Sequence, residues 1–282
     1  MDHRCSKILK LAAEHPHPLD DRLLFIEEGH KYYFDGVPMS MSVTGLLDAV
    51  VADHFDPQAA LASMKRSAKG PNPKYSDVVG GVRVLWPDDR ILAAWEATNV
   101  LGTDLHAKNE LYLNDEPVAF DAAGTNTLEF QYFLAWWAAK TADGWTAFRT
   151  EWVIADPSAD LAGSIDFVMH HASSNIYAIV DFKRCMTKDA GFLRSFGKRF
   201  LPPLSHLEYN KNNKWALQVN AYRTMLEAGY GIRIGLMCMV VFHAENARAE
   251  EHVYPSSPDA EILIARRRKE VLARRAAVAL PM

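Results

Sequence analysis

Cysteine is scarce in this sequence, and that scarcity excludes several classes of protein. The 282 residues include three cysteines, Cys5, Cys185 and Cys238, and no two of them form a CxxC pair. Disulfide scaffolds, zinc knuckles and iron–sulfur proteins need numerous or closely spaced cysteines. We therefore expect none of these frameworks in this chain.

Long apolar runs are also missing. A membrane-spanning helix needs about 20 consecutive apolar residues, whereas the longest candidate, Ile234–Phe242, has the length of a strand. Residues 1–21 lack the apolar core that a secretory signal requires. These absences predict an intracellular protein with no membrane partner, and they do not distinguish cytoplasm, nucleus or organelle.

The composition is that of a globular protein with a local excess of positive charge. Apolar residues make up 49% of the chain and charged residues 23%, and the formal net charge is −4. Residues 183–214 nevertheless contain eight Lys and Arg against two acidic residues, and a second basic group follows at 266–275. Basic clusters can track a phosphate backbone, although a solvated helix face explains the second group at least as well.

Hydrophobic periodicity and turn residues predict both helices and strands, without internal repeats. In the first half we expect a hairpin at 23–36, a loop at 70–81, and helices that start near 42–44 and at 57 (to about 69), 86 (towards 99) and 128. In the second half we expect strands at 148–154, 163–170, 176–183 and 232–242, and helices at 215–228 and from 257 onwards.

This order of elements indicates an α/β fold, in which a central mixed β-sheet is flanked by helices and joined to a helical N-terminal lobe. We place the N-terminal hairpin and helical lobe at residues 1–100 and the core with the C-terminal helix at 101–282. The two parts are expected to form one integrated domain.

The stretch LAGSIDFVMHHASSNIYAIVDFKR reads as two apolar strands around a polar turn, and each strand contains an aspartate. Side chains alternate along a strand, so Asp181 and Lys183 share one face. A four-residue loop at 172–175 would place Asp166 directly opposite Asp181, with Cβ atoms about 4.5–5.5 Å apart. Carboxylates repel at that distance, so the pair favours a bound divalent cation over a shared proton. The alternative without a metal is that Asp166 and Asp181 lie on a solvated face, with Lys183 as their salt-bridge partner.

Further segments contribute residues suited to such a site. Glu151, in the preceding strand, could add a third carboxylate. LGTDLHAKNE predicts a Gly-Thr turn at a helix start, with His106 one turn in and Glu110 on the same face. QVNAY places Gln218 and Tyr222 one helical turn apart. The structural alternatives are that His106 is a helix cap or a core residue, and that Gln218 and Tyr222 form an inter-helix hydrogen-bond pair.

Taken in order, the motifs GTxxH, Glu, GxxD, DxK and QxxxY resemble the PD-(D/E)XK nuclease superfamily, specifically its RecB-like exonuclease branch, which includes phage recombination exonucleases and CRISPR-adaptation nucleases. With YYFDG…MSVTGLL, the resemblance spans roughly residues 30–245, and it implies a restriction-endonuclease-like core. Two positions depart from the pattern: Ile165 replaces the namesake proline, and Asp181 stands where most members have Glu. No cysteine quartet is present, so no iron–sulfur cluster is expected.

The resemblance implies a metal site built from matching residues. Asp166 and Asp181, with the carbonyl of Phe182, would ligate Mg²⁺ or Mn²⁺. His106 and Glu151 would complete the metal shell, at the same ion or at a second one.

The resemblance also implies roles in catalysis and substrate binding. Lys183 would activate water or steady the transition state, and Gln218 and Tyr222 would brace the site or contact the DNA backbone. The basic stretch would line the path of the strand through Arg184, Lys188 and Lys214.

The expected function is metal-dependent hydrolysis of DNA by an exonuclease or a single-strand- or flap-processing enzyme. It would act in repair, replication or recombination, with proteins of replication or recombination as candidate partners. One alternative keeps the chemistry on RNA, as in cap-snatching endonucleases of the same superfamily. The other is a catalytically silent nucleic-acid-binding protein that retains the fold.

Overall fold

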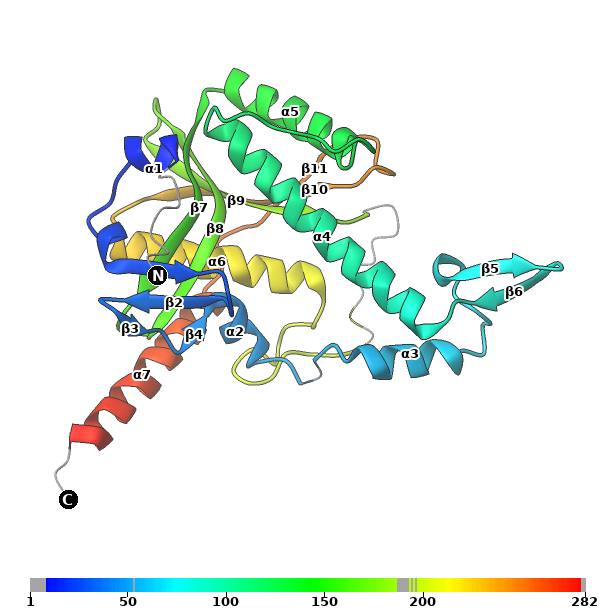
Figure 1. Cartoon of the computed structure of the whole chain (residues 1–282). Coiled ribbons are helices and arrows are strands. Elements are labelled where there is room, and N and C mark those ends of the chain that lie inside the picture. The colour runs from blue at the N-terminus through cyan, green and yellow to red at the C-terminus, as the bar shows by residue number, and fades with distance from the viewer. Residues whose placement is uncertain (1–8, 53, 187–192, 194, 196, 280–282) are drawn as a thin grey trace.

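A six-stranded mixed β-sheet forms the centre of the protein (Figure 1). The computed structural model describes residues 9–52, 54–186, 193, 195 and 197–279. Strand β8 pairs antiparallel with β7 on one edge and β9 on the other, and β10 and β11 follow β9. The pairs β9–β10 and β4–β8 are parallel. The strands are β4 (Met41–Ser42), β7 (Trp145–Asp156), β8 (Leu161–His171), β9 (Ile176–Arg184), β10 (Ile234–Phe242) and β11 (Glu250–Val253).

Helices cover both faces of this sheet, as an α/β fold requires (Figure 1). On one face, α4 (Asp88–Leu113) and α5 (Thr127–Ala142) pack an aromatic layer that includes Phe133 and Phe182. On the other face, α2 (Val43–Asp48), α6 (Lys211–Gly229) and α7 (Asp259–Ala279) bury a layer of mixed aliphatic and aromatic residues. The predicted α/β class and mixed sheet are therefore confirmed.

The N-terminal region adds a small sheet of β1 (Leu23–Ile26), β2 (Lys31–Phe34) and β3 (Val37–Pro38), preceded by α1 (Lys10–Glu14) and a 3₁₀ turn. The β1–β2 hairpin confirms the prediction at 23–36. Ser42 caps α2 by accepting a 3.0 Å bond from the Gly45 backbone, and Asp56 caps α3 (Pro57–Lys65) in the same way through Gln58. Helix α3 ends four residues before the predicted position.

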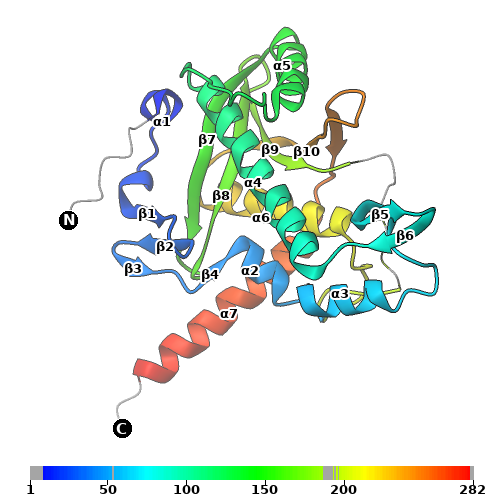
Figure 2. The same ribbon diagram turned by 45° about the vertical axis from the view of Figure 1, so that its right-hand side comes forward.

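The expected loop at 70–81 is wrong, because most of it is a 3₁₀ turn and a β-hairpin. The hairpin consists of β5 (Ser76–Val79) and β6 (Val82–Leu85). Gly80 and Gly81 both have positive φ, which is what a tight two-residue hairpin turn requires. We call α3, β5 and β6 the arm; Figures 1 and 2 show it at the N-terminal end of α4, away from the central sheet. The N-terminal lobe is thus only partly helical.

Helix α4 also differs from expectation, since it runs unbroken through Gly102. We expected one helix towards residue 99 and a second that starts at the Gly-Thr pair. An isolated glycine costs a helix only about 1 kcal/mol, and buried Ile91 and Leu105 anchor the helix on both sides of it. The division drawn at residue 100 falls inside this helix.

The second half follows the predicted order with one addition, although β10 and α7 each begin two residues later than predicted. Strands β7, β8 and β9 and helix α6 extend beyond their predicted ends, and Asn210 caps α6 at its earlier start. Strand β11 was not predicted. No helix among the described residues is long and apolar enough to cross a membrane.

Candidate active site

The β8–β9 hairpin brings the two predicted aspartates together. Its register runs from His171 opposite Ile176 to Phe167 opposite Val180, as the four-residue loop predicts. The next step of this register sets Asp166 opposite Asp181, just where the ladder ends. There the Asp166 carboxylate accepts a 2.8 Å hydrogen bond from the backbone N–H of Phe182.

The sheet opens at this point. On the edge of β8 that faces β9, residues 167–171 pair with β9 and residues 161–162 pair with β4. Residues 163–166 have no strand partner on that edge among the described strands. Asp166 therefore projects from a gap in the sheet, where a side chain satisfies a backbone donor in place of the ladder. Gaps of this kind leave room for a ligand beside the backbone.

Asp181 points to the α6 side and is almost fully buried, with a relative exposure of 2%. Its Oδ1 accepts a 2.9 Å hydrogen bond from Gln218 Nε2, and its Oδ2 pairs with the ammonium of Lys183. A solvated face is thus excluded for Asp181, although the salt bridge to Lys183 is present. Gln218 reaches on to the Tyr222 hydroxyl at 3.5 Å, so the QxxxY pair braces this carboxylate.

Tyr222 explains the glycine of the GxxD motif. A Cβ atom on Gly163 would lie 2.8 Å from Cε1 of Tyr222 and 3.1 Å from Cγ2 of Val43. Both distances are shorter than ordinary van der Waals contact, so only glycine lets the buried tyrosine approach β8. The ring is held against the strand that carries Asp166.

A second group of ligand atoms comes from three different elements. Three donor atoms lie within 4.8 Å of one another, one each from His106 of α4, Glu151 of β7 and Asp166 of β8. His106 Nδ1 is 3.5 Å from Asp166 Oδ2. Nitrogen and carboxylate oxygen donors at this spacing fit a divalent cation such as Mn²⁺ or Mg²⁺. These are three of the predicted metal ligands.

Glu151 occupies an unusual backbone position. It lies in β7 between Thr150, which pairs with Phe167, and Trp152, which pairs with Ile165, and its φ is +41°. A left-handed residue inside a strand costs of order 1–3 kcal/mol, and such strain concentrates at functional sites. Ser164 Oγ donates a 3.1 Å hydrogen bond to the Glu151 carboxylate.

Electrostatics show that the site has more negative than positive charge. Burial and the Asp166 charge raise the pKa of Asp181 to about 6, against the lowering effect of Lys183. Surrounding protein atoms, then the charges of Asp166 and Glu110, raise the pKa of Glu151 to about 8. The Glu151 side chain is exposed, and the repulsion from the neighbouring carboxylates adds to the shift. A cation in the site would relieve it.

Lys183 and Phe182 complete the predicted DFK segment. Burial lowers the pKa of Lys183, but the charges of Asp181 and Asp166 reverse this, and the net shift is upward. The lysine is therefore a firmly held cation. The Phe182 ring packs against Phe133 and Trp136 of α5, while its backbone N–H faces Asp166. Its predicted carbonyl ligation stays a prediction.

The predicted basic contacts are placed differently. Arg184 donates 2.7 Å and 3.0 Å bonds to Glu129 and Asn126 in a largely buried cluster, which ties β9 to α5. Lys214 forms an ion pair with Asp48 of α2. Lys188 lies outside the described residues. Alternation along β9 puts Arg184 on the α5 face, opposite Asp181 and Lys183, and its predicted substrate contact stays a prediction.

Two neighbours were missing from the predicted site residues. Glu110 lies one turn after His106 on α4, and burial raises its pKa. Tyr32 of β2 is buried, and burial with the Glu151 charge raises its pKa to about 12. The i, i+4 spacing of His106 and Glu110 was a usable signal for the first; nothing local to YYFDG indicates the second.

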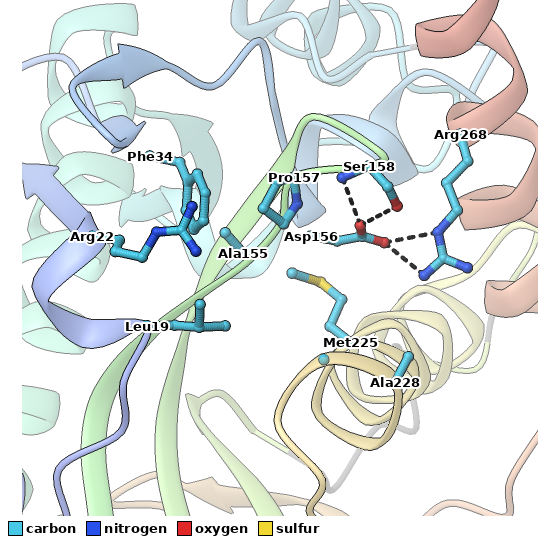
Figure 3. A pocket seen from close by; sticks show the side chains of 11 residues that line it. Leu19, Arg22, Phe34, Ala155, Asp156, Pro157, Ser158, Met225, Ala228 and Arg268 are labelled. Carbon is cyan, nitrogen blue, oxygen red and sulfur yellow. Dashed lines mark hydrogen bonds and ion pairs between the residues drawn. The ribbon is translucent and has the colours of Figure 1, made fainter.

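A separate cavity of 350 Å³ at the Asp156 end of β7 lies between α6, α7 and the N-terminal sheet (Figure 3). Its charges are already paired: Arg268 donates 2.7 Å and 2.9 Å bonds to Asp156, which also accepts from Ser158, and Arg22 pairs with Asp35. None of the predicted site residues lines it. This cavity ties α7 to β7 and is not the candidate site.

Comparisons with known proteins leave the family open. No protein-family model matches the sequence, and no curated protein does. A solved structure described as "Crystal structure of SSO0001" is similar over 54% of this chain, with 11% sequence identity and a TM-score of 0.27. The chain spans 60% of the length of that protein. A similarity of this size carries no argument about function.

Proposed function

We propose that this protein is a divalent-metal-dependent nuclease that hydrolyses DNA phosphodiester bonds, with the restriction-endonuclease-like core of the PD-(D/E)XK superfamily. One observation carries the proposal. The side chains of His106, Glu151, Asp166, Asp181 and Lys183 come from α4 and three adjacent strands and meet at the gap in the sheet. Three carboxylates gathered around one lysine and one histidine need a cation, and they suit phosphate chemistry.

The residues divide the work between them. His106, Glu151 and Asp166 would hold Mg²⁺ or Mn²⁺, and Asp181 borders the same space. Gln218 fixes one oxygen of Asp181 by its 2.9 Å hydrogen bond. Lys183 presents an ammonium group from the same strand, where it can steady negative charge on the phosphate.

The reaction consumes one water molecule per bond. The water oxygen bonds to phosphorus, one P–O ester bond breaks, and the departing oxygen takes a proton to leave a hydroxyl end. A divalent ion held at the site supplies Lewis-acid polarisation of the phosphate and lowers the pKa of water. Asp181 holds the Lys183 ammonium at the site. From there the ammonium can bind a non-bridging phosphate oxygen as negative charge develops on the phosphate.

A cleavage assay tests the proposal. Labelled single-stranded DNA, duplex DNA and RNA are incubated with the full chain in Mn²⁺, in Mg²⁺ and in EDTA. We expect cleavage of DNA that EDTA abolishes. Asp166→Asn and Lys183→Ala should each lower the rate at least about a hundredfold, as the loss of one electrostatic group does in other active sites.

Matched controls separate the site from general surface charge. Glu28→Ala removes an exposed carboxylate and Lys269→Ala an exposed ammonium, both outside the site, and neither should change the rate. Circular dichroism must show that the site variants are folded. Full activity in Asp166→Asn would refute the assignment, and cleavage of RNA alone would assign the same chemistry to the other substrate.

A further inference from the structure

A second cavity, of 770 Å³, is lined by α4, by Phe55 just before α3, by the 3₁₀ turn before β5 and by the segment that leads into α6. Half-buried or exposed aromatic side chains dominate its wall. Phe55 is 72% exposed and meets Trp95 with ring centroids 5.5 Å apart, and Tyr75 meets Trp95 at 6.0 Å. Tyr209 is a fourth aromatic residue in the lining. Exposed aromatic rings in a hollow are the surfaces on which unpaired bases stack.

The charge of the cavity is positive. Lys74, Lys198 and Lys211 line it, and no acidic residue does so among the described residues. Within that part of the chain, neither Lys74 nor Lys211 has a carboxylate at ion-pair distance; the Lys74 ammonium lies 5.5 Å from the Tyr75 ring centre. Lysines left without acidic partners beside aromatic rings suit a ligand that offers both phosphates and flat bases.

Two helices connect this cavity to the candidate active site. On α4, Asn99 lines the cavity and His106 follows seven residues later. On α6, Lys211 lines the cavity and Gln218 also follows seven residues later. Seven residues span about 10 Å of helix axis, which matches about three stacked nucleotides at 3.4 Å each.

We propose that this cavity binds the unpaired bases of a single DNA strand whose backbone continues into the carboxylate site. The inference rests on the proposed nuclease function and names its substrate class. Phe55 and Trp95 stack on bases, and Lys74 and Lys211 neutralise phosphates. Duplex DNA keeps its bases stacked on each other, so it cannot use the rings.

Binding without cleavage tests the inference. Fluorescence anisotropy in EDTA measures Kd for a labelled single-stranded DNA, for its duplex and for RNA of the same sequence. Phe55→Ala should raise Kd for single-stranded DNA about 5- to 100-fold, the loss of one base–aromatic stack. Phe55→Trp, which keeps an aromatic ring at this position, should bind single-stranded DNA as the wild type does. Lys211→Ala should reduce the slope of log Kd against log salt by about 0.7.

The controls match these variants in exposure. Leu272→Ala removes an apolar side chain that is 71% exposed on α7, and Lys269→Ala removes an exposed ammonium on the same helix; neither should alter Kd or the salt slope. Unchanged binding by Phe55→Ala, or equal binding of duplex DNA, would overturn the inference. Tighter binding of RNA would overturn the assignment to DNA.

The two proposals fail separately because the binding assay contains no divalent metal. A chain that binds single-stranded DNA through Phe55 but cleaves nothing overturns the nuclease function. A chain that cleaves DNA while Phe55→Ala binds as the wild type does overturns the role of the cavity.

Discussion

Replacing Glu151 with glutamine should stabilise the metal-free protein. The amide oxygen can still accept the Ser164 hydrogen bond, and the backbone at φ +41° is unchanged. The substitution removes the negative charge of Glu151, which has a carboxylate oxygen within 4.8 Å of an Asp166 oxygen. Two such charges repel by about 1 kcal/mol in water and about 3.5 kcal/mol at an effective dielectric constant of 20. Glu151 is exposed, so we use the lower figure.

The effect should depend on pH, with a sign set by the raised pKa. Glu151 has a folded pKa of about 8 against an ordinary value of 4.5. Its neutral form is favoured in the folded state, so the wild type loses stability as pH rises from about 4.5 through about 8. Glu151→Gln removes that loss. The variant should match the wild type near pH 5 and exceed it by about 1 kcal/mol near pH 9.

Thermal unfolding in EDTA measures the difference. At pH 9 the melting temperature should rise by about 2–4 °C, and added Mn²⁺ should stabilise the variant less than it stabilises the wild type. Asp143→Asn, an exposed carboxylate after α5, is the control and should change neither quantity. A variant that is less stable than the wild type at pH 9, or equally stabilised at both pH values, would refute the reasoning.

Three further substitutions test how the site is supported. Gly163→Ala should cost about 1–3 kcal/mol in urea unfolding, since the new Cβ would lie 2.8 Å from Tyr222. Gly102→Ala, with open space around the added methyl in α4, should instead gain up to about 1 kcal/mol; a loss there would contradict the continuous helix. Arg184→Ala leaves Glu129 buried without its cation and should cost about 3–5 kcal/mol. Unchanged stability with weaker DNA binding would instead make this arginine a substrate contact.

Local patterns predicted the centre of the site. A four-residue turn between two alternating strands sets one register, and that register places Asp166 across from Asp181 without knowledge of the rest of the fold. The position of Gln218 and Tyr222 on one helix face followed from the helical period. The starts of α2 near Ser42 and of α3 at Pro57 are set by local signals as well, and they were correctly placed.

Long-range partners could not be predicted in this way. Arg184 is 55 residues from Glu129 along the chain, and only the packing of α5 on the sheet brings them together. Periodicity likewise cannot show that packing on both sides of Gly102 holds α4 straight. The β5–β6 hairpin of the arm was missed for a different reason: its turn residues, Gly80 and Gly81, were interpreted as loop when they join two strands.

The costs that meet at the gap in the sheet argue against a catalytically silent protein. Glu151 has a strained backbone, burial and then neighbouring carboxylates raise its pKa and that of Asp181, and Lys183 is held beside them. Glutamine at 151 would remove one of these negative charges and keep the Ser164 hydrogen bond. A module that only binds nucleic acid gains nothing from opposed carboxylates, which repel phosphate. A bound cation would turn the same group into an attractive site for phosphate, and these costs would then serve a function.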